Sequence, residues 1–277
     1  MSWGLKIGTV NIQGGYNQKK EFLVEECSKF GLDLLALCDT GYTGKLNGGV
    51  REESVGREGR RVLLSGVKQG RQNWGVGLIL GCGIEKRLLE VGYVNERLMW
   101  ARFSLKDLIC RVVVVYAPCN GTRGADMDAF YNLLEGVVLG AGGDKLIIMG
   151  DFNGWIGSDN RGYENIMGKW GDGKPVNGNG KRLLDFCLGF GLVITNSVFP
   201  HKMVHKYTWE DKKLGNSKSI IDFVLVSADL RRFVLDTRVY RGFEFGVGES
   251  TNGGSDHYLV CSFLRIKWET AKFTKVN

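Results

Sequence analysis

The chain has 277 residues, 43% of them hydrophobic and 24% charged, so it is long enough for one large globular core and too apolar to be disordered. Lysine and arginine outnumber aspartate and glutamate by 37 to 30, and the net charge of +7 favours a polyanionic partner such as nucleic acid or an anionic lipid head. No stretch approaches about 18 apolar residues, the length of a membrane span, and no Cys/His spacing suggests a zinc module. We therefore expect a soluble protein with no membrane partner. The seven cysteines form an odd set with no CxxC pair, which indicates reduced thiols and an intracellular protein.

Short apolar runs alternate irregularly with helical patterns, which argues against a regular barrel and a simple Rossmann sheet. Strands are expected at residues 6–11, 33–39, 62–65, 75–80, 98–105, 109–116, 145–149, 192–196, 206–209, 220–226, 234–240 and 257–266. Helices are expected at residues 19–30, 126–139 and 182–190. Because no helical pattern separates the strands between 62 and 116, this region predicts antiparallel pairing.

The runs at 112–115 and 220–226 are nearly continuous in apolar character, so both faces of these strands should be covered. This pattern favours an α/β protein with two packed sheets and helices outside them. The three prolines are scattered, and no Ser/Gly/Pro-rich linker interrupts the chain. We therefore expect one domain over residues 1–268, followed by a C-terminal tail at 269–277.

Polar residues stand at the ends of several expected strands, where an α/β scaffold usually presents its chemistry. They are Asn11, Asp39, Tyr116, Asp151, Asn196 and Asp256, and His257 follows the last of them. This shared position predicts one cluster of carboxylates, amides and an imidazole.

Two short segments carry the most chemistry. Gly150-Asp151-Phe152-Asn153 places a possible base and an amide that could orient a phosphate oxygen on one loop after a buried strand. Taken alone, an Asx-turn that closes a strand explains this segment better. Ser255-Asp256-His257 places an acid and an imidazole on a turn before an apolar strand, and such a pair taken singly is more often structural than catalytic.

The order of these residues resembles the endonuclease/exonuclease/phosphatase superfamily over nearly the whole chain. The motifs that carry the resemblance are Asn11, Asp39, Tyr116-Ala117-Pro118, Gly-Asp-Phe-Asn at 150–153, Thr208-Trp209, Asp222 and Ser-Asp-His at 255–257. The segments that begin at Asn177, Leu192, His205, Ile221 and Gly254 are similar to the endonuclease domains of non-LTR (LINE-type) retrotransposons and to craniofacial development protein 2. The resemblance implies a DNase I-like fold, a four-layer α/β/β/α sandwich of two mixed, largely antiparallel sheets.

The resemblance also implies the roles of the site residues. The catalytic residues would be Asp151, Asn153, His257, Asp222, Tyr116 and Asn11. Asp151 would activate the attacking water, and Asp222 would fix the tautomer of His257, which would stabilise charge on a phosphate oxygen. Asp39, Asp256 and Asn11 would bind Mg²⁺, with Mn²⁺ as a substitute, because these hard ions take oxygen ligands.

Three positions depart from the family pattern. Asp39 stands in Leu37-Cys38-Asp39-Thr40 where the family has a glutamate, so the metal-binding carboxylate is one methylene shorter. Gln13 stands where abasic-site endonucleases have an acid, and Cys119 stands where an asparagine is frequent, although Asn120 could substitute for it. Of the three departures, the shorter acid at position 39 most calls the expected activity into question, because the expected Mg²⁺ site depends on it.

Five residues are expected to contact DNA: Thr208, Trp209, Asn120, Lys202 and Lys206. The basic region 202–218 beside Trp209 supports this expectation, because phosphate contacts and an aromatic probe suit a nucleic-acid surface. On composition alone, a core role is the more common one for Trp209.

We therefore expect a Mg²⁺-dependent DNA endonuclease of retrotransposon origin, monomeric and nuclear, that nicks a target site to leave a 3′-hydroxyl and a 5′-phosphate. Two alternatives stay open. A phosphatase or phosphodiesterase for a small molecule would use the same core site. A domesticated nucleic-acid-binding module would keep the fold and have lost catalysis, which the shorter acid at position 39 would suit.

Overall fold

The computed structural model describes residues 4–44, 48–67, 74–211, 217–246 and 255–266. The expected tail at 269–277 lies outside the described residues. Within the described part of the chain, no helix combines the length and the apolar character that crossing a membrane requires.

The described residues form two large β-sheets and one short strand pair. The first sheet contains β1 (Leu5–Asn11), β2 (Leu34–Cys38), β3 (Val50–Val55), β4 (Arg60–Ser65), β5 (Val76–Leu80), β14 (Val234–Tyr240) and β15 (Leu259–Leu264). The second contains β6 (Leu88–Asn95), β7 (Leu98–Leu105), β8 (Leu108–Tyr116), β9 (Lys145–Asp151), β10 (Leu192–Ile194) and β13 (Asp222–Ser227). The separate pair consists of β11 (Trp209–Glu210) and β12 (Lys218–Ser219).

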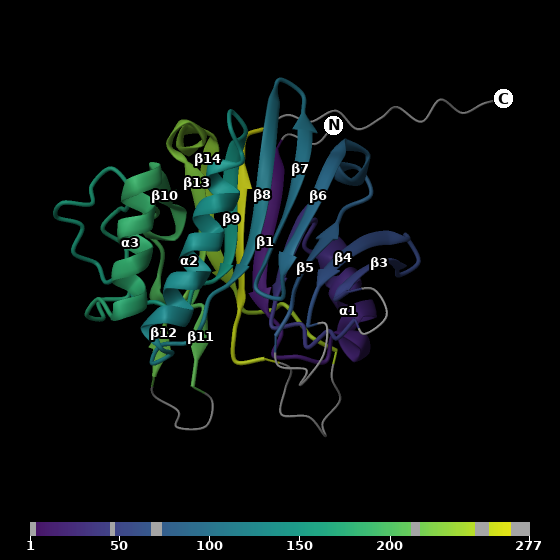
Figure 1. Ribbon diagram of the computed structural model, residues 1–277, viewed down its shortest axis with the longest axis horizontal. Helices are drawn as coiled ribbons and strands as arrows, with labels where there is room; N and C mark the ends of the chain where they lie inside the picture. The colour runs from purple at the N-terminus through teal and green to yellow at the C-terminus, as the bar shows by residue number, and fades with distance from the viewer. Residues whose placement is uncertain (1–3, 45–47, 68–73, 212–216, 247–254, 267–277) are drawn as a thin grey trace.

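Within the described ranges three α-helices accompany these strands: α1 (Tyr16–Lys29), α2 (Gly124–Leu139) and α3 (Gly178–Phe190). Helix α1 packs on the outer face of the first sheet, and α2 and α3 cover the outer face of the second (Figure 1). The order of layers is therefore α/β/β/α, as expected from the sequence. Short 3₁₀ helices connect some strands: η1 (Ile84–Arg87), η2 (Thr195–Ser197), η3 (Met203–His205) and η4 (Ala228–Phe233).

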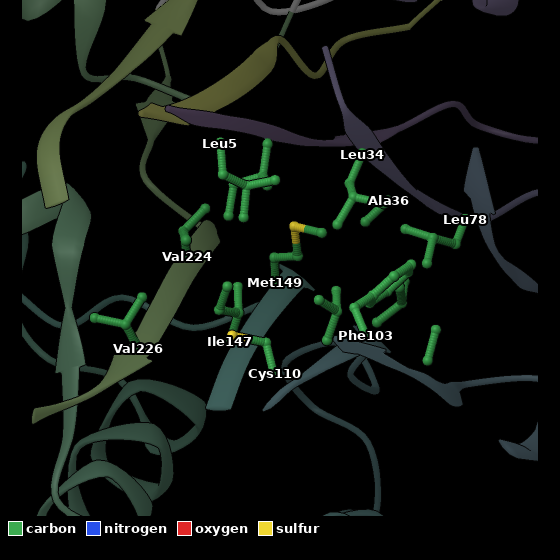
Figure 2. Packing of buried hydrophobic residues seen from close by; sticks show 14 of the residues in the cluster. Leu5, Leu34, Ala36, Leu78, Phe103, Cys110, Ile147, Met149, Val224 and Val226 are labelled. Atoms are coloured by element: carbon green, nitrogen blue, oxygen red, sulfur yellow. The ribbon is translucent and has the colours of Figure 1, made fainter. Parts of the chain in front are cut away.

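The central core lies between the two sheets (Figure 2). Leu5 and Leu34 of the first sheet face Phe103, Met149 and Val224 of the second, and all five are buried. Full burial of one such side chain contributes about 1.5 to 3 kcal/mol, so this layer holds the sheets firmly against each other. The relative position of their edges is fixed as a result.

Some strands differ from the expectation, and the reasons are local. The expected strand at 206–209 is wrong, because η3 precedes it and only Trp209 enters β11. The expected strand at 192–196 ends early, where η2 begins. Strands β3 and β6 have no counterpart in the expectation, because both are edge strands with partly exposed, mixed-polarity residues and therefore lack a strong apolar pattern.

Strand direction brings the polar strand ends to one edge. β1 runs parallel to β2, with Asn11 opposite Cys38, and β8 runs parallel to β9, with Tyr116 opposite Asp151. β13 is antiparallel to β9, with Asp222 opposite Asp151. The carboxyl ends of β1, β2, β8 and β9 and the start of β13 therefore lie at one edge. The polar residues at the strand ends had predicted such a cluster.

Gly150 permits the tight pairing beneath this edge. Its φ angle is 152°, and a Cβ at this position would lie 1.9 Å from the carbonyl oxygen of Val115. A larger residue would push β9 away from β8, so the glycine is needed to keep Asp151 beside Tyr116.

Candidate active site

Asp151 is held by donors from both sheets. The Nδ2 atom of Asn11, at the end of β1, donates to Asp151 Oδ2 over 2.9 Å, and the backbone N–H of Asn153 donates to Asp151 Oδ1 over 2.9 Å. Asp151 itself is only 1% exposed. Because each carboxylate oxygen accepts a hydrogen bond, the orientation of this acid is fixed.

His257 and Asp222 form a second buried pair. His257 Nδ1 lies 2.9 Å from Asp222 Oδ2, and both residues are buried. An ionised carboxylate can only accept, so Nδ1 carries the proton in this contact. His257 Nε2 then faces Asp256 Oδ1 at 3.7 Å and Asp151 Oδ2 at 3.9 Å. The pair His257–Asp222 therefore adjoins the pair Asn11–Asp151, and the first and second sheets each supply part of this cluster.

Burial and charge shift the pKa values of these groups. Burial raises the pKa of Asp39 to about 6, although His257, Lys19 and Arg97 each lower it. Burial and the charge of Asp222 raise the pKa of Asp151. Burial alone would lower the pKa of His257, but the carboxylates, Asp222 first among them, raise it above its ordinary value. Perturbed groups that share one cluster are typical of functional sites.

Two of the expected site residues have a left-handed backbone. Asp39 has φ 51° and Asn153 has φ 49°, and neither is glycine. The surroundings hold both conformations: Gly14 N donates to Asp39 O over 2.6 Å, and Asn153 Nδ2 donates to Ala117 O over 2.9 Å. Such conformations cost free energy and cluster at functional sites.

The side chains of Thr208 and Lys206 are buried and bond to other parts of the fold, and their contact with DNA stays a prediction. Thr208 is fully buried, and its Oγ1 accepts from Ile221 N at 3.0 Å and Asp222 N at 3.1 Å. Lys206 is also buried, and its Nζ donates to Gly171 O over 2.6 Å. Thr208 therefore positions the strand that carries Asp222.

The other three residues expected to contact DNA lie nearer the surface. Asn120 and Lys202 are exposed, and Trp209 is half-buried. The backbone of Trp209 forms a bridge with His257 and thereby borders the buried cluster. Contact between these residues and DNA stays a prediction.

Two different sets of residues are candidates for binding a metal ion. Asp39, Asp256 and Asn11 form the set implied by the family resemblance. Among the described residues, Asp151, Asp222 and His257 form a group whose ligand atoms all lie within 4.8 Å of one another. In that group Asp222 Oδ2 and His257 Nδ1 already bind each other, which leaves fewer free atoms for an ion.

Gln13, one of the departures from the family pattern, takes a structural role at this edge. Its Oε1 accepts from Asp256 N at 3.1 Å, and its own backbone N–H donates to Asn11 Oδ1 over 2.9 Å. An amide therefore links the end of β1 to the turn that carries Asp256 and His257.

Arg97 and Trp74 are neighbours of the site that no sequence pattern indicated. The guanidinium carbon of Arg97 lies 4.7 Å from the ring centre of Trp74 and 5.3 Å from that of Tyr116. Arg97 Nη1 also donates to Tyr116 O over 3.1 Å. Trp74 is 40% exposed, so an aromatic ring and a cation border the cluster beside Tyr116.

Comparisons with known proteins give both sequence relatives and similar solved structures. No family model matches the chain. Craniofacial development protein 2 of Bos taurus is 27% identical over 94% of this chain, and that of Tragulus javanicus is 26% identical over 94%. The matched regions cover 41% and 42% of those proteins, so the chain spans about two fifths of the length of the curated relatives it matches.

Three solved structures are similar over nearly their whole length. The endonuclease domain of TRAS1, a telomere-specific non-LTR retrotransposon, matches with a TM-score of 0.63 and 15% identity, covering 95% of this chain and 99% of that one. The 3′-5′ exonuclease NExo of Neisseria meningitidis matches with a TM-score of 0.64 and 18% identity, covering 95% and 100%. An AP endonuclease from Archaeoglobus fulgidus matches with a TM-score of 0.62 and 17% identity, covering 94% and 99%. The chain therefore has the endonuclease/exonuclease/phosphatase fold.

Proposed function

We propose that this chain is a metal-dependent phosphodiesterase that nicks DNA and leaves 3′-hydroxyl and 5′-phosphate ends. One observation carries the proposal: the pairs Asn11–Asp151 and His257–Asp222 adjoin in one buried cluster that joins the edges of both sheets. Such a cluster offers a fixed carboxylate as base beside a charged imidazole, which suits attack of water on a phosphate.

Each residue has a distinct part in the proposed reaction. Asp151, held by Asn11 and the backbone of Asn153, takes the proton from the attacking water. His257 donates from Nε2 to a non-bridging phosphate oxygen, while Asp222 holds the imidazole at Nδ1. The hydroxyl of Tyr116 and the amide of Asn153 are proposed to bind the same phosphate.

The residues present fit a divalent cation. Asp256 Oδ1 and Asp222 Oδ1 are buried and have no hydrogen-bond partner among the described residues. Buried carboxylate oxygens without a donor are costly unless a cation binds them. Asp39, Asp256 and Asn11 would hold Mg²⁺, or Mn²⁺ in its place, because oxygen donors suit these ions. When bound, such an ion supplies Lewis-acid stabilisation of charge on the phosphate and the leaving oxygen.

DNA is the proposed substrate on the basis of charge and of the similar structures. The net charge of +7 favours a polyanion. One similar structure is a 3′ phosphatase NExo from Neisseria bound to a product DNA hairpin, and another is the TRAS1 endonuclease domain. On these grounds we propose an origin in a retrotransposon, a nuclear location and a monomeric domain.

Nicking of supercoiled plasmid DNA tests the proposal. With Mg²⁺ the wild-type chain is expected to convert supercoiled DNA to open circles, and EDTA should abolish the conversion. Asp151→Ala should reduce the rate by about 10²- to 10⁴-fold, the usual contribution of a positioned base. Nicking that continues unchanged in EDTA, or in the Asp151→Ala protein, would contradict the proposed mechanism.

A phosphatase is the second candidate, because the NExo match is described as a 3′ phosphatase. Release of inorganic phosphate from a 3′-phosphorylated oligonucleotide or a small phosphorylated compound, without plasmid nicking, would favour it. Salt-sensitive DNA binding without hydrolysis would instead indicate a binding module.

A further inference from the structure

The segment Asn177-Gly178-Asn179-Gly180 begins helix α3, and the proposed reaction assigns it no part. Asn177 is the N-cap residue of the helix, and its Oδ1 accepts from Gly180 N at 2.8 Å. The same oxygen accepts from Trp155 N at 3.0 Å. The cap therefore attaches the helix to the chain that leaves Asn153.

Asn179 makes a second connection, to two different loops. Its side chain is buried, and Nδ2 donates to Pro118 O at 3.1 Å and to Asn153 O at 2.9 Å. One oxygen belongs to the loop that follows Tyr116, and the other belongs to the loop that carries Asp151 and Asn153. Since a primary amide has two N–H groups, these two carbonyls use both of them.

Two glycines bring the helix close enough for these contacts. A Cβ at Gly154 would lie 2.8 Å from Gly180 N, and a Cβ at Gly180 would lie 1.8 Å from Trp155 O. No side chain fits between the start of α3 and the loop after Asn153. The asparagines and the glycines of this segment therefore serve one arrangement, in which the helix start lies directly against the catalytic loop.

We propose that Asn179 is a positioning residue that fixes the Tyr116 loop relative to the Asp151–Asn153 loop. The two loops follow β8 and β9, whose pairing ends at Tyr116 and Asp151. Beyond that point one backbone bond, from Ala117 N to Asp151 O, and side-chain bonds hold the loops together. Asn153 Nδ2 donates to Ala117 O, and Asn179 adds a donor on each side of that contact. The expected effect of Asn179 on the rate rests on the proposed hydrolysis, whereas its expected effect on the position of the two loops does not.

Three variants of Asn179 distinguish the loss of its hydrogen bonds from the loss of its side-chain volume. Asn179→Asp has nearly the same shape and cannot donate, Asn179→Ser keeps one donor, and Asn179→Ala removes the group. The matched control is Asn160→Ala, because Asn160 Nδ2 donates to the backbone oxygen of Met167 elsewhere in the segment before α3. Thermal unfolding of each variant confirms that it is folded.

Two readouts test the role. In plasmid nicking, Asn179→Asp and Asn179→Ala should lower kcat by about 10- to 100-fold with little change in KM, Asn179→Ser should be intermediate, and Asn160→Ala should match wild type. Hydrogen exchange should become faster at the amides of Ala117 and Asn153, which donate to Asp151 O and Asp151 Oδ1, and should not change at Val113 within β8.

The outcomes are distinguishable. Unchanged exchange at Ala117 and Asn153 in folded Asn179→Asp would overturn the positioning role, and so would wild-type kcat in that variant. Faster exchange in the variants of a chain that never nicks DNA would support the positioning role and reject the proposed hydrolysis. Equal loss of kcat in Asn160→Ala would also overturn it, because the effect would then not be specific to the two loops.

Discussion

In the part of the chain that the structure describes, histidine contacts aspartate at two places, and the two places differ. His257 and Asp222 are buried, and Asp222 Oδ1 has no hydrogen-bond partner among the described residues. His201 Nε2 lies 2.6 Å from Asp236 Oδ1, but Asp236 is partly exposed, and its Oδ2 pairs with Arg238 Nε at 3.3 Å. The second pair is an ordinary surface network in which the carboxylate has a cation.

The difference shows that a His–Asp contact alone does not define a site. Around His257, Asp151 and Asp256 add further carboxylates that face Nε2, and Asp151 and the Oδ1 atom of Asp256 are buried, which limits their hydration. Acid groups that crowd a buried imidazole are costly, and a ligand with positive charge would stabilise them. His201 has no such surplus of acids, so the predictions below contrast the two pairs.

Loss of the buried carboxylate should have the largest effect. Asp222→Asn keeps the shape of the side chain but removes the charge that orients and stabilises the imidazolium, so kcat for plasmid nicking should fall by about 100-fold. Asp236→Asn makes the same change at the surface pair and should leave kcat within the error of the assay. Equal losses of kcat in Asp222→Asn and Asp236→Asn would show that the buried pair contributes no more to catalysis than the surface pair.

The same substitution should shift a measurable pKa. The carboxylates favour the protonated imidazole, so the pKa of His257 lies above its ordinary value, and the charged form is present below that pKa and lost as pH rises through it. Because Asp222 is the first of the charges that raise it, Asp222→Asn should move the midpoint to lower pH. NMR titration of the imidazole in EDTA measures the shift, and an unmoved or raised midpoint would contradict the assigned cause.

An intermediate effect is expected from the hydroxyl that supports Asp222. Thr208→Val leaves the buried N–H groups of Ile221 and Asp222 without an acceptor, which should cost about 1 to 3 kcal/mol of unfolding free energy and about tenfold in kcat. Thr195→Val is the matched control, because its buried hydroxyl donates to Val224 O farther along β13. Chemical denaturation should show a loss in both variants, whereas the loss of kcat should be confined to Thr208→Val.

The smallest effect should come from lengthening one acid. Asp39→Glu restores the longer side chain of the family pattern, and its carboxylate would reach a cation without a bridging water, so kcat should rise several-fold at low Mg²⁺ concentration. The dependence of the nicking rate on Mg²⁺ concentration measures this. A lower rate at every concentration would show that the site is built around the shorter acid.

Much of the cluster could be predicted because its residues follow apolar strands. Asn11, Tyr116 and Asp151 each end a buried run, and parallel or adjacent strands bring such ends together. The order of motifs then supplied the connection to His257 and Asp222. The fold could be predicted for the same reason, since continuous apolar strands require cover on both faces.

The remaining features depend on contacts that no local pattern records. Thr208 was expected to contact DNA, and only the fold shows that its hydroxyl is fully buried and accepts from two backbone N–H groups at the start of β13. Asn179 begins a helix and resembles any polar first-turn residue, and only the fold places it beside Pro118. Arg97 lies on the turn between the edge strand β6 and the inner strand β7, and its position beside Tyr116 results from the pairing of β7 with β8.

The pairing of β1 with β15 has a consequence for biosynthesis. Leu5 lies opposite Leu264, so strands far apart in the chain are neighbours in the first sheet, and His257 stands just before the later of them. A nascent chain on the ribosome exposes Asn11, Asp39 and Asp151 well before His257 and β15 emerge. The proposed nuclease site therefore stays incomplete until His257 has emerged and β15 has joined the sheet.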